Sequence, residues 1–353
     1  MVSLTSAGAV RLSHECGFEL AGVAPALPTS DAEEYLDWVS RGRAGAMGYL
    51  TDRRARLRQD PRNLLPAARS IVCVGRLYNT PHPAGADEYA GWISRYAWGE
   101  DYHRVLRRDL ERLAFRMEEA AGPFDYKVCV DTAPLLERSY ARLAGLGWIG
   151  KNTCLIHQGA GSWFFLGELI TSLDLAPASP PPDRCGTCTR CIDACPTQAL
   201  VQLTSARHEL DATRCISYVT IELRGPIEET LRPEAGRHLF GCDICQDVCP
   251  WNRRAPVTAD AAFAPRNYAP PLTQMSALSE EEFLAMFQGT PVTRARYSGF
   301  LRNVTVAMGN AGKPELRAPL ERLAGSPDSL VSEHARWALA RLPPEPPSNY
   351  ERI

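Results

Sequence analysis

Twelve residues decide how this chain is interpreted: Cys185-Gly-Thr-Cys188-Thr-Arg-Cys191-Ile-Asp-Ala-Cys195-Pro196. They follow the C-x2-C-x2-C-x3-C-P spacing of bacterial ferredoxins. A shorter copy, Cys242-Asp-Ile-Cys245-Gln-Asp-Val-Cys249-Pro250, comes later, and Cys215 stands alone between the two. Together they supply the cysteines that two four-iron clusters need. The sequence therefore predicts a ferredoxin-like module with two [4Fe-4S] clusters.

The spacing also predicts which cysteine binds which cluster. Short C-x2-C loops bring successive thiolates onto one cluster, whereas the x3-C-P step directs the fourth thiolate to the other cluster. We therefore expect two ligand sets: Cys185, Cys188, Cys191 and Cys249 for one cluster, and Cys195, Cys215, Cys242 and Cys245 for the other.

Other uses of these cysteines fit the pattern less well. Two four-cysteine zinc sites would take the same residues, but zinc ribbons pair C-x2-C units and the two Cys-Pro endings favour iron and sulfur. Disulfides are disfavoured in a reducing cytosol. Two clusters in one module favour electron transfer over a purely structural role. The remaining cysteines, Cys16, Cys73, Cys129 and Cys154, lie in apolar contexts and are expected to pack as small hydrophobic residues.

Length and composition set the class of protein. The chain has 353 residues, of which 45% are hydrophobic and 23% charged, with a net charge of -2. This length allows two or three domains. Because no global basic field exists, contact with nucleic acid must come from local patches. No apolar run approaches the ~20 residues of a membrane helix. The N-terminus resembles no secretory signal, so we expect a cytoplasmic location.

The pattern of apolar residues predicts an α+β fold in three parts. Residues 1–177 would form an N-terminal α/β domain, 178–256 the two-cluster module, and 270–345 a set of HEAT-like helical repeats. Helices are expected at 3–16, 31–42, 102–117, 279–288, 299–310, 314–324 and 329–342. Strands are expected at 71–75, 127–131, 153–157 and 163–170.

Four further stretches carry a family resemblance: Ser94–His103 (SRYAWGEDYH), Val130–Arg138 (VDTAPLLER), Gly145–Cys154 (GLGWIGKNTC) and Gly299–Asn310 (GFLRNVTVAMGN). In this order around the cysteine pattern, the chain resembles epoxyqueuosine reductases from about residue 15 to residue 342. That family is itself similar to reductive dehalogenases. The resemblance implies reduction of epoxyqueuosine to queuosine at the wobble position of tRNA, with two electrons and two protons consumed and water released.

The resemblance also implies cobalamin, held by the N-terminal domain. No side chain supplies the low-potential reductant that epoxide reduction needs, so a cofactor must. By resemblance, the cobalamin contacts are Arg54, Ser94, Tyr96, Asp131, Lys151, Asn152, Leu155, Ser162 and Leu166. Asp101-Tyr-His103 matches half of the D-x-H-x-x-G cobalt-ligating pattern, but Leu106 replaces its glycine. We therefore expect His103 at the start of a helix or as a polar contact, with no protein histidine on cobalt.

Asp131 is the candidate proton donor. It ends an expected strand, at the edge where open sheets commonly bind ligands. An apolar pocket would raise its pKa and keep it protonated. The alternative is a capping or turn residue just ahead of a helix that begins near Pro134. The family match at Val130-Asp131-Thr132 favours the catalytic role.

Contact with tRNA is expected at the start of a C-terminal helix, through Arg294, Arg296, Arg302 and Asn303. A second basic run, residues 41–62, would grip phosphates or be a solvated helix face. The target base would be extruded from the anticodon loop. We expect a monomer served by an external electron donor of unknown identity. Two alternatives stay open: a cobalamin and iron–sulfur reductase of a small molecule such as an organohalide, and an electron carrier that serves another enzyme.

Overall fold

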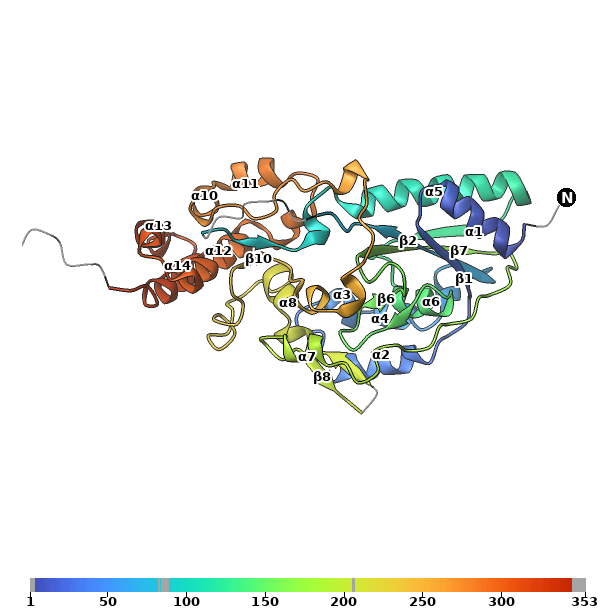
Figure 1. The fold of residues 1–353 in the computed structure, drawn as a ribbon, viewed down its shortest axis with the longest axis horizontal. Helices are drawn as coiled ribbons and strands as arrows, with labels where there is room; N and C mark the ends of the chain where they lie inside the picture. The colour runs from blue at the N-terminus through green and yellow to red at the C-terminus, as the bar shows by residue number, and fades with distance from the viewer. Residues whose placement is uncertain (1–3, 82, 84–88, 205–206, 345–353) are drawn as a thin grey trace, which may run out of the picture. The chain divides into compact units, whose positions relative to one another are not determined.

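The computed structural model describes the whole chain except residues 1–3, 82, 84–88, 205–206 and 345–353 (Figure 1). The chain forms two compact units, which are described separately. Unit 1 consists of residues 1–81, 100–213 and 244–264. Unit 2 consists of residues 82–99, 214–243 and 265–353.

A four-stranded sheet forms the centre of unit 1. Its strands follow the order β1 (Leu20–Pro25), β2 (Ser70–Leu77), β7 (Phe164–Thr171) and β4 (Tyr126–Cys129). Every neighbouring pair is antiparallel. The register places Glu168 of β7 between Cys73 of β2 and Cys129 of β4. The N-terminal part is therefore α+β, and the expected α/β arrangement is corrected, because a parallel sheet would need a crossover between each pair of strands.

Helices pack on both faces of this sheet. On one face lies α5 (Tyr102–Ala121), which meets β7 at Gly167, where an added Cβ would come within 2.9 Å of Leu110 (Figure 1). The apolar face expected for this helix is buried as predicted: Val105, Leu106, Leu110, Leu113 and Met117. On the other face, α6 (Glu137–Leu143) contributes Tyr140 and Ala141 to an apolar cluster.

The rest of unit 1 is short elements. The helices are α1 (Ser6–Glu15), α2 (Asp31–Ser40), α3 (Gly48–Thr51), α4 (Arg54–Leu57), α7 (Arg190–Asp193) and α9 (Ile244–Asp247). Two small antiparallel hairpins pair β5 (Trp148–Ile149) with β6 (Leu155–Ile156), and β8 (Leu200–Gln202) with β9 (His208–Leu210). Single 3-10 turns occur at Pro61–Asn63, Ala212–Arg214, Pro250–Asn252 and Ala261–Phe263.

Unit 2 is mostly helical. Its helices are α8 (Ile216–Ile221), α10 (Leu272–Ala277), α11 (Glu280–Phe287), α12 (Tyr297–Ala311), α13 (Arg317–Ala324) and α14 (Ser329–Leu339). Two strands, β3 (Trp92–Ile93) and β10 (His238–Phe240), pair in parallel. Further 3-10 turns lie at Arg95–Ala97, Pro291–Ala295 and Pro314–Leu316.

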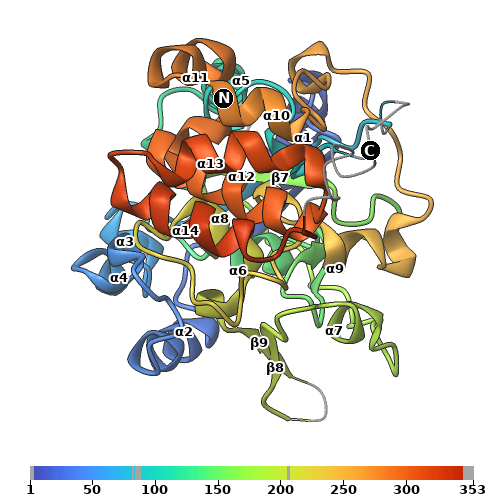
Figure 2. The same ribbon diagram turned by 90° about the vertical axis from the view of Figure 1, so that its left-hand side faces the viewer.

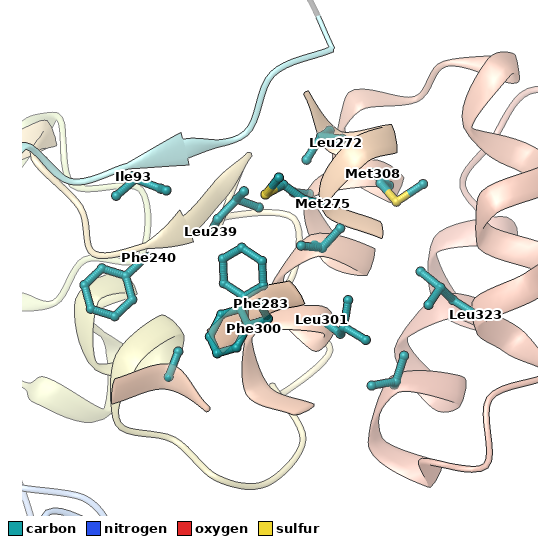
Figure 3. Packing of buried hydrophobic residues seen from close by; sticks show 14 of the residues in the cluster. Ile93, Leu239, Phe240, Leu272, Met275, Phe283, Phe300, Leu301, Met308 and Leu323 are labelled. Atoms are coloured by element: carbon teal, nitrogen blue, oxygen red, sulfur yellow. The ribbon is translucent and has the colours of Figure 1, made fainter. Parts of the chain in front are cut away.

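One apolar core holds unit 2 together. Figure 3 shows Phe283 and Phe300 packed close to Leu239 and Met275 in this core. Helices α12 and α14 approach closely at Gly309, where an added Cβ would lie 2.8 Å from Cα of Ala338 (Figure 2). The helices expected at 279–288, 299–310, 314–324 and 329–342 are confirmed as α11 to α14. Their arrangement as HEAT-like repeats stays a prediction.

The two compact units divide the chain differently from the three expected domains, whose boundaries stay a prediction. Most of the cysteine-rich module belongs to unit 1, but residues 214–243 belong to unit 2. Tertiary hydrogen bonds explain part of this division. Within unit 1, Ser162 bonds to Asn252, and within unit 2 the guanidinium of Arg302 bonds to the carbonyl of Val219. Among the described residues, no helix combines the length and the apolar character that a membrane span requires.

Candidate active site

Asp131 lies on a short loop between β4 and α6 in unit 1. Its backbone adopts a positive φ of 46°, a conformation that aspartate tolerates better than most residues. Its backbone N–H donates a hydrogen bond to the carboxylate of Glu137, the first residue of α6. Leu136 is the N-cap of α6 and no side chain caps this helix. Asp131 is therefore not a helix cap, but its positive φ fits the turn role that the alternative interpretation also allowed.

The side chain of Asp131 faces a histidine. Its Oδ2 lies 3.1 Å from Nε2 of His103, whose Nδ1 lies 2.7 Å from Oδ1 of Asp101. Asp101 also caps α5 by accepting the backbone N–H of His103 at 3.0 Å. Burial alone would lower the pKa of His103, but hydrogen bonds to Asp101 and Asp131 together raise it to about 9. The imidazole therefore carries a proton at neutral pH, directly beside the carboxyl group of Asp131.

These surroundings correct one expectation. The side chain of Asp131 is 45% exposed, and its partner is a polar imidazole. The apolar pocket that we expected around it is therefore absent from this structure. The open-sheet argument for its position fails as well, because that rule concerns parallel strands and β4 is antiparallel to β7. The position of Asp131 depends instead on His103 and Glu137.

Two carboxyl groups lie behind Asp131, and the sequence analysis missed both. Glu168 in β7 is completely buried. The charge of Asp131 raises the pKa of Glu137, and the charge of Glu137 raises the pKa of Glu168. A signal for Glu168 was present in the sequence. Phe164–Thr171 reads FFLGELIT, and a glutamate inside a buried apolar strand is almost never fully buried unless it is paired with another group.

A cavity of about 900 Å³ opens beside Asp131 in unit 1. Asp131, Glu137 and Thr153 contribute to its wall, together with Tyr35 and Trp38 of α2. The two aromatic rings stack at 6.2 Å between centroids, and Nε1 of Trp38 donates to the carbonyl of Leu210 at 2.6 Å. The charged part of the lining consists of four arginines and seven acids: Arg41, Arg58, Arg138 and Arg207, and Asp31, Glu33, Glu34, Asp37, Asp131, Glu137 and Glu209. Arg41 is paired with Asp37 and Glu209, and Arg207 with Glu34. The stacked rings suit a planar base.

The first predicted cysteine set gathers in unit 1. After burial, the charges of Cys185, Cys249 and Cys188 are the strongest influences that raise the pKa of Cys191, which reaches about 11. The charges of these three thiols thus act on Cys191, and the assignment of the four residues to one cluster stays a prediction. Within the described part of the chain, no three or more His, Cys, Asp or Glu side chains are close enough to hold a single metal ion.

The second predicted set is divided between the units. Cys195 and Cys245 belong to unit 1, whereas Cys215 and Cys242 belong to unit 2. Cys215 is the N-cap of α8. The assignment of these four residues to one cluster stays a prediction. Of the other cysteines, Cys16, Cys73 and Cys129 are buried and Cys154 is half-buried.

Three of the expected cobalamin contacts reach toward the cysteine segments of unit 1. Lys151 donates from Nζ to the carbonyl of Gly186 at 2.8 Å, and Asn152 donates to the carbonyl of Cys245 at 3.4 Å. Ser162 accepts from Nδ2 of Asn252 at 2.9 Å. The structure thus brings Lys151, Asn152 and Ser162 to the segments that carry the cluster cysteines.

The other expected cobalamin contacts have different surroundings. Leu155 is buried in the apolar cluster below the sheet, and Leu166 packs against this cluster. Arg54 in α4 pairs with Asp52 at 2.7 Å near the surface. In unit 2, Ser94 donates from Oγ to the carboxylate of Asp243. The ring of Tyr96 packs against that of Phe240, with 5.9 Å between the ring centroids.

Two of the expected tRNA contacts are corrected. Arg302 and Asn303 are 0% and 1% exposed, and their side chains bond to backbone carbonyls inside unit 2. They cannot reach a nucleic acid from this position, because α12 is buried along most of its length. Arg296 is exposed, and Arg294 is half-buried and ion-paired with Glu222 at 2.5 Å. These two stay predicted tRNA contacts.

Comparison with family models gives two matches. A model described as epoxyqueuosine reductase QueG, DUF1730, matches residues 58–132, which include His103 and Asp131. A model described as a 4Fe-4S double cluster binding domain matches residues 184–252, which include all eight cysteines of the two predicted sets. The second match favours iron–sulfur clusters over the zinc alternative.

Curated relatives and solved structures agree with these models. An epoxyqueuosine reductase of Xanthomonas campestris pv. campestris is 43% identical over 94% of each chain. That of Escherichia coli (strain K12) is 38% identical over 93% of this chain and 86% of its own. A crystal structure of epoxyqueuosine reductase with an epoxyqueuosine-modified tRNA-Tyr stem loop is 28% identical, with a TM-score of 0.87, covering 94% of this chain and 88% of that chain. The Streptococcus thermophilus enzyme gives a TM-score of 0.84 at 30% identity, over 96% and 90%.

Proposed function

Because the chain belongs to the epoxyqueuosine reductase family, we propose that it reduces epoxyqueuosine to queuosine at the wobble position of tRNA. The reaction consumes two electrons and two protons and releases the epoxide oxygen as water. The observation that carries this proposal is the placement of Asp131 on the wall of a large cavity, with a protonated imidazole at its carboxyl group.

Asp131 acts as the proton donor by passing on the proton that the imidazolium of His103 holds beside its carboxylate. A proton held between Nε2 of His103 and Oδ2 of Asp131 is available to the departing oxygen of a substrate in the cavity. Asp101 holds the other ring nitrogen of His103 and thereby fixes the orientation of the ring. A general acid in this position contributes on the order of 10²–10⁴-fold to the rate.

Cobalamin supplies the strongly reducing cobalt centre that no side chain provides. The residues present fit such a group. Of the nine expected contacts, Asp131 lines the cavity, whereas Lys151 and Asn152 offer an ammonium and an amide donor at the cysteine segments. We assign the remaining contacts to Ser162, Leu155, Leu166, Arg54, Ser94 and Tyr96.

Two [4Fe-4S] clusters take the eight cysteines. Cys185, Cys188, Cys191 and Cys249 hold one cluster, and Cys195, Cys215, Cys242 and Cys245 hold the other. After burial, the charges of the other three thiols raise the pKa of Cys191 most, which supports this division. The electrons come from an external donor, and we place the first cluster nearer to the corrin.

The tRNA presents its modified base as an extruded nucleotide. The stacked rings of Tyr35 and Trp38 suit this base, and Arg294 and Arg296 suit backbone phosphates in unit 2. We place the enzyme in the cytoplasm as a monomer.

The test is anaerobic turnover with the reconstituted full-length protein. Epoxyqueuosine-bearing tRNA, cobalamin and a strong chemical reductant are incubated with it, and the nucleosides are analysed by mass spectrometry. Queuosine formed by the wild type and by Asp125→Asn, an exposed control, but not by Asp131→Asn, supports the proposal. If organohalides are reduced and epoxyqueuosine is not, the small-molecule alternative replaces it. If no corrin absorption accompanies intact clusters, the chain is an electron carrier.

A further inference from the structure

Trp148 of β5 is 2% exposed, which keeps its indole N–H away from water. This Nε1–H finds no hydrogen-bond partner among the residues that the structure describes. An indole N–H only donates, and a buried donor without an acceptor is disfavoured, because it has given up its hydrogen bond to water. Buried tryptophans therefore normally have a partner for this group. An acceptor outside the polypeptide would satisfy it.

The neighbours of Trp148 include two cysteines that we assign to one cluster. Trp148, Ile156 and Cys249 form a small buried apolar cluster of side chains, and Cys185 and Trp251 pack against it. Of the eight cysteines assigned to iron–sulfur clusters, Cys249 is the one that is buried. The indole ring therefore belongs to the apolar surroundings of the ligands Cys185 and Cys249.

The hairpin that carries Trp148 is fastened to the cysteine segments at two further points. Nζ of Lys151 donates to the carbonyl of Gly186, which lies inside the first cysteine run, at 2.8 Å. Nδ2 of Asn152 donates to the carbonyl of Cys245, in the second run, at 3.4 Å. Both residues lie in the turn between β5 and β6, whose pairing is antiparallel. The hairpin therefore holds the indole in a fixed position beside these segments.

Two kinds of acceptor come into question for this N–H. One is the face of the Trp251 ring, whose centroid lies 5.0 Å from that of Trp148 with the ring planes at 76°. A ring face is a weak acceptor. The other is a sulfur that carries negative charge, and hydrogen bonds to charged acceptors are stronger. A contact of this second kind is present at the other cysteine set, where the backbone N–H of Ala199 donates to Sγ of Cys195 at 3.3 Å.

Resting on the cluster assignment proposed above, we propose that the indole N–H of Trp148 donates a hydrogen bond to a sulfur of the cluster that Cys185 and Cys249 help to hold. The acceptor is a thiolate or a sulfide of that cluster, which share the same negatively charged sulfur chemistry. Uptake of one electron makes the cluster more negative, so the hydrogen bond stabilises the reduced form more than the oxidised form. Hydrogen bonds to the sulfurs are one of the determinants of cluster potential, and this one raises it.

The first experiment detects the hydrogen bond directly in the anaerobic, reconstituted full-length protein. Tryptophan labelled with nitrogen-15 at the indole nitrogen is incorporated, the clusters are reduced with dithionite, and pulsed electron paramagnetic resonance records the hyperfine coupling of the label. We expect a nitrogen-15 coupling and an exchangeable proton coupling in the wild type, and neither in Trp148→Phe. Trp38→Phe is the matched control, because the N–H of Trp38 already donates to the carbonyl of Leu210 at 2.6 Å, and it should retain both couplings.

The second experiment measures the midpoint potentials of the two clusters by a redox titration of the same samples. Trp148→Phe keeps an apolar ring but has no N–H, so the midpoint of one cluster should fall while the other stays at its wild-type value. We expect the ratio of reduced to oxidised cluster at a fixed potential to fall on the order of tenfold, which corresponds to about 59 mV for one electron. Trp38→Phe should change neither midpoint.

Three results would overturn the proposal: a wild type without nitrogen-15 coupling, a coupling that survives in Trp148→Phe, or midpoints that Trp148→Phe leaves unchanged. A midpoint that rises in Trp148→Phe would also overturn it, because the ring would then act by excluding water. If Trp148→Phe fails to take up clusters, the spectrum of the labelled wild type still decides.

Neither experiment needs tRNA or cobalamin, so both are separate from the test of the proposed function. If the couplings and the shifted midpoint are found but no queuosine forms, the proposed function fails and the hydrogen bond stands. If the anaerobic protein binds no iron, the cluster assignment fails and the role of Trp148 fails with it.

Discussion

The substitution Arg302→Met tests whether this arginine holds unit 2 together or contacts tRNA. Its guanidinium donates to three backbone carbonyls in and after α8: to Val219 at 2.6 Å, to Gly225 at 2.7 Å and to Leu223 at 2.9 Å. Burial lowers its pKa to about 10, so it remains charged at neutral pH. Methionine fills a similar volume but donates no hydrogen bond.

The expected loss follows from the acceptors that would be left without a partner. Each buried polar group without a hydrogen bond costs about 1–3 kcal/mol, which gives roughly 3–9 kcal/mol for three carbonyls. Because water can enter and the loop after α8 can relax, we expect the loss in free energy of unfolding to lie in the lower half of this range, about 3–5 kcal/mol. A domain is stable by only about 5–15 kcal/mol, so this change brings unit 2 close to unfolding.

The measurement is urea unfolding of the anaerobic, reconstituted protein, followed by circular dichroism, with iron content and tRNA affinity measured on the same samples. Arg296→Met makes the same chemical change at an exposed arginine directly after the 3-10 turn Pro291–Ala295, and it is the matched control for the unfolding midpoint. We expect a large shift of the unfolding midpoint for Arg302→Met only. An unchanged midpoint with weakened tRNA binding would show that the buried position is wrong and would restore the original expectation.

Three further substitutions test the site. Asp131→Asn retains a residue that tolerates the positive φ, and it should lose on the order of 10²–10⁴-fold in turnover, measured by nucleoside mass analysis, with clusters intact. Cys215→Ala should remove one of two clusters in an iron and sulfide assay, whereas Cys16→Ala, at a buried thiol outside both sets, should remove none. His103→Gln should lower stability below pH 6.5, and the difference from the wild type should vanish as the pH rises through about 9. A raised histidine pKa stabilises the fold only while the imidazole holds its proton. Equal unfolding midpoints of the two proteins at pH 6 would contradict this.

Local spacing explains what the sequence could predict. The cysteines predicted for the first cluster lie within a few residues of one another, apart from Cys249, which the spacing rule assigns to the same cluster. The apolar face of residues 102–117 predicts the helix that the structure shows as α5 (Tyr102–Ala121), and Asp101 caps it. These features are set by neighbours along the chain, so a single sequence carries them.

Long-range pairing explains what the sequence could not predict. The strands were found, but their antiparallel order depends on which edges meet, and the apolar pattern of a buried strand does not encode this. Arg302 stood beside exposed arginines in the sequence, and only the packing of α12 against α8 shows that it is buried. A run of charged residues usually predicts an exposed segment, but here Arg296 is exposed whereas Arg302 is buried in the core of unit 2.

The acid site shows the same limit at the scale of single side chains. Asp131 was found from its family motif, but the groups that control it come from α5, α6 and β7, more than 25 residues away in two of three cases. The antiparallel register decides that Glu168 faces the cluster side of the sheet, because a shift by one residue would turn it toward α5. A donor at the rim of a cavity needs a proton nearby and a fixed backbone. Here the imidazole of His103 supplies the first and the carboxylate of Glu137 supplies the second, so the chemistry of one residue depends on the folding of the whole sheet.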